Sequence, residues 1–198
     1  MIRLAVLVSG SGSNMQAIID STRNGILKAV AEVVLVISNN ADAYALQRAR
    51  NEDIKSVCIE RKFFSDPKFF NDAILQELLS ERIDLICLAG YMTLIGENIV
   101  FRYESKILNI HPALLPKFAG KGMYGRYVHE AVIRAKEKKS GATVHFVEAE
   151  YDLGEIILQK EVDVLDNDLP EELTKRVLEI EHQIYPQAIK EVIERKFI

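Results

Sequence analysis

Three short apolar runs, each followed by a turn rich in glycine, serine or asparagine, constrain the fold of this chain. Residues 3–8, 33–37 and 84–89 are almost continuously apolar, which is typical of strands buried on both faces of a sheet. Segments with helical spacing of apolar residues separate them. This alternation predicts an α/β fold with a doubly wound, mostly parallel sheet and helices on both faces. Ligands of such sheets bind beyond the carboxyl ends of the strands.

The rest of the chain supplies connecting helices and a hairpin. We expect helices near 43–51, 69–80 and 128–137, a strand at 55–59, and a hairpin of strands at 141–147 and 156–162. The last helix begins at Pro170, followed by two glutamates, a proline-and-acid helix start. Pro186 lies within that helix and is expected to kink or restart it.

Composition limits the class of protein. The chain has 198 residues, 48% hydrophobic and 27% charged, with a net charge of −4. One domain with a sizeable core is expected, and the scattered basic residues argue against nucleic-acid binding. The sequence shows no membrane span and no signal peptide, so we expect no membrane partner and a cytoplasmic location. Cys58 and Cys87 lie in apolar runs and are expected to be buried, without a disulfide or metal site.

The loop Ser9–Asn14 (Ser-Gly-Ser-Gly-Ser-Asn) joins the first strand to a helix. Ser13 or Asn14 is expected to cap that helix. A glycine-rich loop at a helix N-terminus binds anions, because backbone N–H groups and the helix dipole converge there. The loop lacks the lysine of a nucleotide-triphosphate loop, and Met15 replaces the third glycine of a dinucleotide fingerprint. We therefore expect a phosphate monoester, with a tight turn that binds nothing as the alternative.

The stretch Asn109–Pro116 (Asn-Ile-His-Pro-Ala-Leu-Leu-Pro) ends a short apolar run and is stiffened by two prolines. Asn109 and His111 are two residues apart, so at a strand end their side chains share a face. An amide donor beside an imidazole suits a reaction in which negative charge develops on a carbonyl oxygen. A polar strand end capped by a turn explains the same residues, so both interpretations stay open here.

Three other segments could complete a site. Lys117–Gly125 contains three glycines and suggests a loop that wraps over a ligand, and acidic residues cluster around Asp152. Residues 91–95 are apolar for a loop. They either line a pocket for a flat ring or belong to the core, and composition alone favours the core. His145 lies on an alternating strand, and we expect it to be a hydrogen-bonded structural residue beside the site.

These motifs resemble those of the glycinamide ribonucleotide (phosphoribosylglycinamide) formyltransferases of the formyl transferase superfamily, over essentially the whole chain. The resemblance is carried by Ser9–Asn14, Ala89-Gly90-Tyr91-Met92, Asn109–Pro116, Tyr151-Asp152-Leu153-Gly154 and Glu181-His182. The Asn109–Pro116 motif is specific only to the superfamily. The Ser9–Asn14 loop is more selective, because it resembles the phosphate site for glycinamide ribonucleotide.

The resemblance implies one formyltransferase domain over 1–198, with a Rossmann-like, phosphate-binding half (1–103) and a half that completes the catalytic and folate site (104–198). It implies a monomer or homodimer that uses 10-formyltetrahydrofolate and no metal in de novo purine synthesis. The implied catalytic residues are Asn109, His111 and Asp152. The implied substrate-binding residues are Gly12, Ser13, Asn14 and Glu181, and the implied folate-binding residues are Met92, Thr93, Leu94, Ile95 and Asn109.

The residue types suit this chemistry. The substrate amine attacks the formyl carbon, Asn109 and a protonated His111 stabilise the oxyanion, and Asp152 is expected to raise the pKa of His111. Two positions depart from the family pattern. Pro67 and Lys68 stand where relatives often have an arginine that contacts folate, and Leu153 stands where some have a glycine.

Two alternatives remain. Another 10-formyltetrahydrofolate-dependent formyltransferase or hydrolase would be expected to carry a further domain, whereas this chain runs from Met1 to Ile198. A non-catalytic phosphate-binding module on the same fold would not need the asparagine, histidine and aspartate together.

Overall fold

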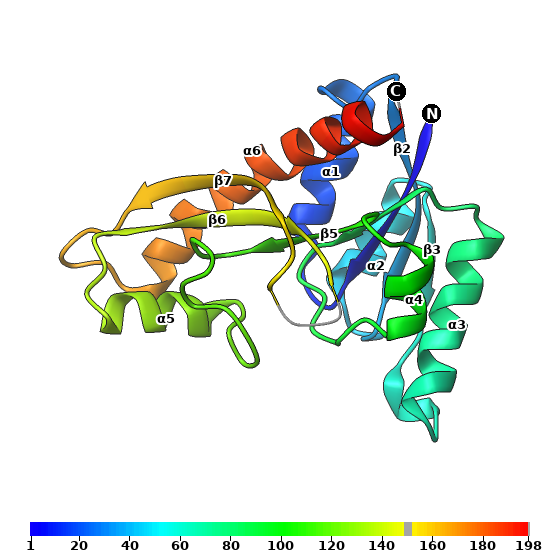
Figure 1. Ribbon diagram of the computed structural model, residues 1–198, viewed down its shortest axis with the longest axis horizontal. Helices are drawn as coiled ribbons and strands as arrows, with labels where there is room; N and C mark the ends of the chain where they lie inside the picture. The colour runs from blue at the N-terminus through cyan, green and yellow to red at the C-terminus, as the bar shows by residue number, and fades with distance from the viewer. Residues whose placement is uncertain (149–151, 198) are drawn as a thin grey trace.

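The computed structural model describes residues 1–148 and 152–197 and contains one seven-stranded sheet (Figure 1). The strands are β1 (Ile2–Val8), β2 (Ala31–Ser38), β3 (Lys55–Cys58), β4 (Leu85–Leu88), β5 (Ile107–His111), β6 (Lys139–Phe146) and β7 (Ile156–Asp163). The helices are α1 (Ser13–Asn24), α2 (Tyr44–Asn51), α3 (Pro67–Ser80), α4 (Glu97–Arg102), α5 (Arg126–Arg134) and α6 (Pro170–Lys196), with a 3₁₀ turn at Arg61–Phe63.

The strand order is β3-β2-β1-β4-β5-β6-β7. The first five strands pair in parallel, whereas β5 with β6 and β6 with β7 pair antiparallel. The predicted doubly wound, mostly parallel α/β sheet is therefore confirmed. The apolar runs become its central strands because both of their faces are covered. The antiparallel addition brings the β6–β7 hairpin beside the carboxyl end of β5, where the sequence predicted a site.

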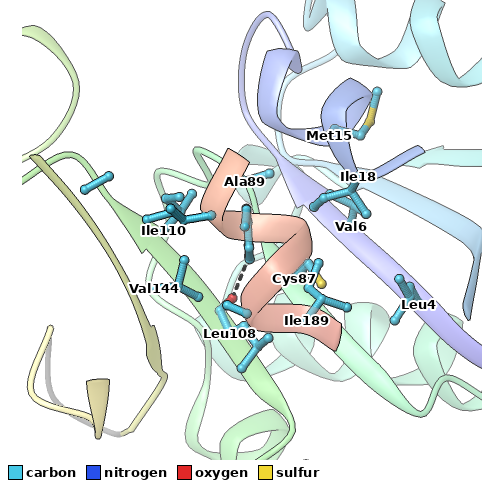
Figure 2. Packing of buried hydrophobic residues seen from close by; sticks show 14 of the residues in the cluster. Leu4, Val6, Met15, Ile18, Cys87, Ala89, Leu108, Ile110, Val144 and Ile189 are labelled. Carbon is cyan, nitrogen blue, oxygen red and sulfur yellow. Dashed lines mark hydrogen bonds between the residues drawn. The ribbon is translucent and has the colours of Figure 1, made fainter. Parts of the chain in front are cut away.

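Two hydrophobic clusters cover the two faces of the sheet. Alternate residues of β1 point to opposite faces, so Leu4 and Val6 join one cluster whereas Ala5 and Leu7 join the other. Helices α1, α2 and α6 contribute to the first cluster, and α3 and α4 to the second. Figure 2 shows Ile189 of α6 among the buried side chains of the first cluster.

Several local predictions need correction. The residue that caps α1 is Gly12, in a left-handed conformation and without a side-chain hydrogen bond, not Ser13 or Asn14. Helix α6 runs as one helix through Pro186, so the predicted restart is wrong, while the alternative of a kink stays a prediction. Cys87 is buried as expected, but Cys58 is exposed, because β3 is the edge strand and its last residue is left uncovered.

Other differences concern the ends of elements. Strand β5 continues to His111, beyond the predicted apolar run, because residues 108–111 pair with β6. Helix α3 begins two residues early, at Pro67, where the Asp66 side chain accepts a hydrogen bond from Lys68 N–H. No helix in residues 1–148 and 152–197 combines the length and apolar composition needed to cross a membrane.

Candidate active site

A cavity of about 600 Å³ opens beyond the carboxyl ends of β4 and β5. Its lining brings together most of the residues that the family resemblance singled out: Asn14, Met92, Thr93, Leu94, Ile95, Asn109, His111, Asp152 and Glu181. Gly12 and Ser13 directly precede Asn14 in the chain, but they are not among the residues that line the cavity. Pro67 and Lys68 also lie outside its lining, at the start of α3, where Lys68 pairs with Asp72.

The Ser9–Asn14 loop leaves the first turn of α1 open to an anion. Gly12 has φ +74°, and a Cβ built on it would lie 2.6 Å from Ala45 Cβ. Only glycine fits this left-handed position against α2 without displacement. Because Gly12 offers no side chain as a cap, the first N–H groups of α1 stay free for a ligand. Ala45 N–H and Arg48 Nε donate to loop carbonyls at 3.1 and 2.9 Å and so hold the loop from behind.

Asn14 and Glu181 join the loop to the long helix α6. Asn14 Nδ2 donates to Glu181 Oε2 at 2.6 Å, across a sequence separation of 167 residues. Burial raises the pKa of Glu181 to about 7, although the Asn14 hydrogen bond acts in the opposite direction. Asn14 Oδ1 is buried without a hydrogen-bond partner among the described residues. A sugar hydroxyl would supply the missing donor.

Asn109 and His111 lie on one face of β5, as their spacing predicted. His111 is buried, and its Nε2 lies 2.9 Å from Phe118 O. A carbonyl oxygen only accepts hydrogen bonds, so Nε2 carries a proton and Nδ1 is the nitrogen left for chemistry. His111 Nδ1 lies 3.8 Å from Asp152 Oδ2, close enough for charge interaction but too far for a hydrogen bond.

Asp152 has φ +55° and accepts a hydrogen bond from Gly120 N–H at 3.0 Å. Burial alone would raise the pKa of Asp152, but His145, the Gly120 N–H and His111 together hold it below its ordinary value. The Gly120–Gly125 segment lines the same cavity, so the predicted wrapping loop lies beside the site. Tyr151, the first residue of the acidic motif, lies outside the described residues.

The expected rise in the pKa of His111 is wrong. Burial lowers the pKa of His111 below its ordinary value, and the opposing effects of the Asp152 charge and the Phe118 hydrogen bond do not compensate for it. The sequence indicated the charged neighbour correctly but could not indicate how deeply the imidazole is buried. A pKa below its ordinary value leaves His111 mainly neutral at pH 7.

The segment Met92–Ile95 combines the two roles that the sequence left open. Ile95 is buried in the second cluster, whereas Met92 and Leu94 are about half exposed beside the cavity. Met92 N–H donates to Ser9 Oγ, and Thr93 Oγ1 accepts from Asn39 Nδ2. These bonds attach the segment to the ends of β1 and β2.

Three residues near the cavity have contacts that the sequence did not indicate. His145 contacts the catalytic candidates, since its Nε2 lies 3.1 Å from Asn109 Nδ2, which extends the structural role predicted for it. His129 of α5 is buried and lines the cavity, and burial lowers its pKa to about 4. Thr143 bonds both Ala113 O and Leu115 N–H and so holds the proline-containing loop. Alternation along β6 could have marked Thr143 and His145 as same-face neighbours, but not their partners.

The described residues contain no cluster of three or more His, Cys, Asp or Glu side chains that could hold a metal ion. The cavity side chains supply several groups that can take part in chemistry. They offer an amide, a neutral imidazole and an ionised carboxylate at one end, and a helix N-terminus with a buried carboxyl group at the other.

Comparison with known proteins relates this geometry to one family. The model of the formyl transferase family matches residues 2–189. Phosphoribosylglycinamide formyltransferase of Haemophilus influenzae is 45% identical over 190 residues, which cover 96% of this chain and 86% of that protein. The trifunctional purine biosynthetic protein adenosine-3 of Drosophila melanogaster is 42% identical over 94% of this chain, which spans only 14% of that longer protein.

A solved structure agrees with these sequence relatives. The crystal structure of glycinamide ribonucleotide transformylase 1 from Symbiobacterium toebii superposes with a TM-score of 0.89 and 42% identity, covering 96% of this chain and 86% of that one. Family, sequence and fold comparisons all extend over nearly the whole chain. The chain therefore belongs to the formyl transferase family and, within it, to the phosphoribosylglycinamide formyltransferases.

Proposed function

We propose that this enzyme transfers a formyl group from 10-formyltetrahydrofolate to the amine of glycinamide ribonucleotide. The observation that carries the proposal is the convergence on one cavity of Asn109, His111 and Asp152 with the Asn14–Glu181 pair of the anion-binding loop. A cavity of about 600 Å³ lies within the usual range for small-molecule sites. Formyl transfer to a phosphorylated amine needs both ends of this cavity, one to bind the phosphate and one to carry out the reaction.

The anion-binding end orients the acceptor. The open N–H groups at the start of α1 would receive the phosphate, because the helix dipole favours negative charge there. Asn14 Oδ1 and the Glu181 carboxyl group would receive the ribose hydroxyls, which supply the donors that the buried amide oxygen lacks. This arrangement directs the amine of the ribonucleotide toward β5.

The other end carries the chemistry. As the amine attacks the formyl carbon, negative charge develops on the formyl oxygen, and an N–H of Asn109 stabilises it. Neutral His111 accepts the amine proton at Nδ1, since its Nε2 proton is held by Phe118 O. The ionised Asp152, 3.8 Å away, stabilises the imidazolium that forms. The same proton then passes to the departing folate nitrogen, so the imidazole ends neutral.

Met92–Ile95 and the Gly120–Gly125 segment would hold the folate. The half-exposed Met92 and Leu94 offer apolar surface to a flat ring at the rim of the cavity. Backbone groups of a loop segment can hydrogen-bond the polar edge of such a ring. The Gly120–Gly125 segment also lines the cavity and carries the Gly120 N–H that hydrogen-bonds Asp152.

The test is a formyl-loss assay. Purified protein and 10-formyltetrahydrofolate should lose the formyl group only when glycinamide ribonucleotide is present. Formyl loss without the amine would contradict the proposal and indicate a hydrolase. Absence of turnover with both substrates, in protein that still binds glycinamide ribonucleotide by calorimetry, would indicate a binding module instead.

A further inference from the structure

The side chains of His145 and Asn109 lie within hydrogen-bonding distance of one another beside the cavity. The two residues are opposite one another in the antiparallel register of β5 and β6, and His145 is only 2% exposed. His145 Nδ1 lies 2.8 Å from Phe146 O. Because a carbonyl oxygen cannot donate, Nδ1 must carry a proton.

The second ring nitrogen must then accept. His145 Nε2 lies 3.1 Å from Asn109 Nδ2, and because an amide nitrogen only donates, Nε2 accepts this bond with its lone pair. Asp152 Oδ1 lies 3.6 Å from the same nitrogen, too far for a hydrogen bond. The chain of bonds therefore runs in one direction, from Asn109 N–H to His145 and from His145 N–H to the backbone.

We propose that His145 is a positioning residue that holds the Asn109 amide with its nitrogen toward the ring, leaving the second N–H of that nitrogen for the formyl oxygen. This inference rests on the proposed formyl transfer. An asparagine amide is nearly symmetric in shape, so without the acceptor it can turn over and present its oxygen instead. An oxygen facing the developing oxyanion repels it, whereas an N–H stabilises it.

Packing alone is the competing explanation for a buried histidine. A packing role depends on the volume of the side chain, and a positioning role depends on the acceptor at Nε2. Glutamine and methionine separate the two, because they have similar lengths and only glutamine carries an acceptor near the Nε2 position. His145→Gln and His145→Met are therefore matched variants.

The kinetic experiment compares kcat and KM for these variants. We expect His145→Met to lower kcat about tenfold, less than the loss of an oxyanion donor outright, and His145→Gln to stay within about threefold of the original enzyme. KM for glycinamide ribonucleotide and the melting temperature should be similar in both variants. Equal kcat values for the two, whether high or low, would overturn the positioning role.

A double-mutant cycle with Asn109→Ala tests whether His145 acts through Asn109. If it does, His145→Met should cause little further loss once the amide is absent, because interacting residues are not additive. A full, independent loss of kcat in the Asn109→Ala background would contradict the proposal. It would show that His145 acts on the reaction by another route.

A spectroscopic measurement keeps this inference separate from the proposed function. In protein labelled with ¹⁵N-histidine, the His145 signals, assigned by their loss in His145→Gln, should show a proton on Nδ1 and none on Nε2. A proton on Nε2 at neutral pH would overturn the inference even in a fully active enzyme. If the enzyme shows no formyl transfer, the proposed function fails and the kinetic role of His145 fails with it, whatever tautomer is found.

Discussion

The two ends of the cavity each bury a carboxyl group, and burial has opposite outcomes there. Asp152 keeps a pKa below its ordinary value because two imidazoles and the Gly120 N–H face it. Glu181 is more deeply buried, and its pKa is raised to about 7 because burial outweighs the opposing hydrogen bond from the neutral Asn14 amide. The charge of each carboxyl group therefore reflects a balance between burial, which raises its pKa, and neighbours that stabilise the ionised form.

The two carboxyl groups suit different roles, catalysis at the β5 end of the cavity and substrate binding at the α1 end. An ionised carboxylate beside a neutral imidazole can stabilise the imidazolium that forms when the imidazole accepts a proton. A carboxyl group with a pKa near 7 can hydrogen-bond sugar hydroxyls in both its neutral and its ionised form. We therefore expect changes at the β5 end to act mainly on kcat. Changes at the α1 end should act mainly on substrate binding and on the pH dependence of stability.

The largest effect should come from His111→Ala at the β5 end. Removal of the proton acceptor should lower kcat about 10³-fold, within the range of general acid–base catalysis. KM for glycinamide ribonucleotide should change little, because the α1 end is untouched. Steady-state kinetics and a thermal melt on the same preparation separate lost chemistry from lost folding. A variant that keeps its activity would break the proposed assignment of the two ends.

Asp152→Asn should lower kcat about 10²-fold by removing the charge that stabilises the imidazolium. Asparagine tolerates the positive φ of this position and can still accept from Gly120 N–H. The loop should therefore stay in place, and only the charge is lost. Loss of folding together with activity would show that Asp152 serves the loop rather than the chemistry.

Glu181→Gln should change how stability depends on pH. The folded protein holds the Glu181 proton up to about pH 7, whereas an ordinary glutamate releases it near 4.5. Between these values the unfolded chain binds fewer protons, so the free energy of unfolding falls as pH rises and is level above about pH 7. The variant should lose this fall and gain about 3 kcal/mol at alkaline pH, since each pKa unit of the shift corresponds to about 1.4 kcal/mol.

Denaturant titrations at several pH values measure this change. The Asp152→Asn variant is the control, because Asp152 has a pKa shifted in the opposite direction. Its removal should not abolish the fall between acid and neutral pH. An unaltered pH profile in Glu181→Gln would show that the raised pKa of Glu181 does not distinguish the two ends.

The smallest effect should come from the turn behind the anion site. Gly12→Ala places a Cβ on a left-handed residue and 2.6 Å from Ala45 Cβ, which should cost about 1–2 kcal/mol of stability. It should also raise KM for glycinamide ribonucleotide, because the loop moves away from α2. Gly10→Ala is the matched comparison, since a Cβ there meets nothing within 4 Å. Equal loss of stability in both variants would contradict this explanation.

The sequence predicted the elements better than the contacts between them. Continuous apolar runs are local signals, so the central strands and the place of Asn109 and His111 on one face could be read directly. The pairing of Asn14 with Glu181 depends on how α6 crosses the sheet 167 residues later. A local sequence pattern cannot predict a contact between residues so far apart in the chain. Only the family resemblance indicated that both residues bind the substrate.

Electrostatic predictions failed where they depended on burial. The sequence placed an acid near His111 but could not show that the imidazole is enclosed, so the direction of its pKa shift was wrong. The partner of His145 was missed for a similar reason, because it follows from the register of β5 against β6. The exposed Cys58 is a further case, since nothing in its apolar run identifies β3 as the edge strand.

The most direct test of the whole account follows the formyl carbon itself. The enzyme should be supplied with 10-formyltetrahydrofolate that carries ¹³C in the formyl group, together with glycinamide ribonucleotide, and the products followed by NMR. The label should appear as an amide on the ribonucleotide amine, with one product formed for each formyl group lost. Release of the label as formate while the ribonucleotide stays unmodified would contradict it.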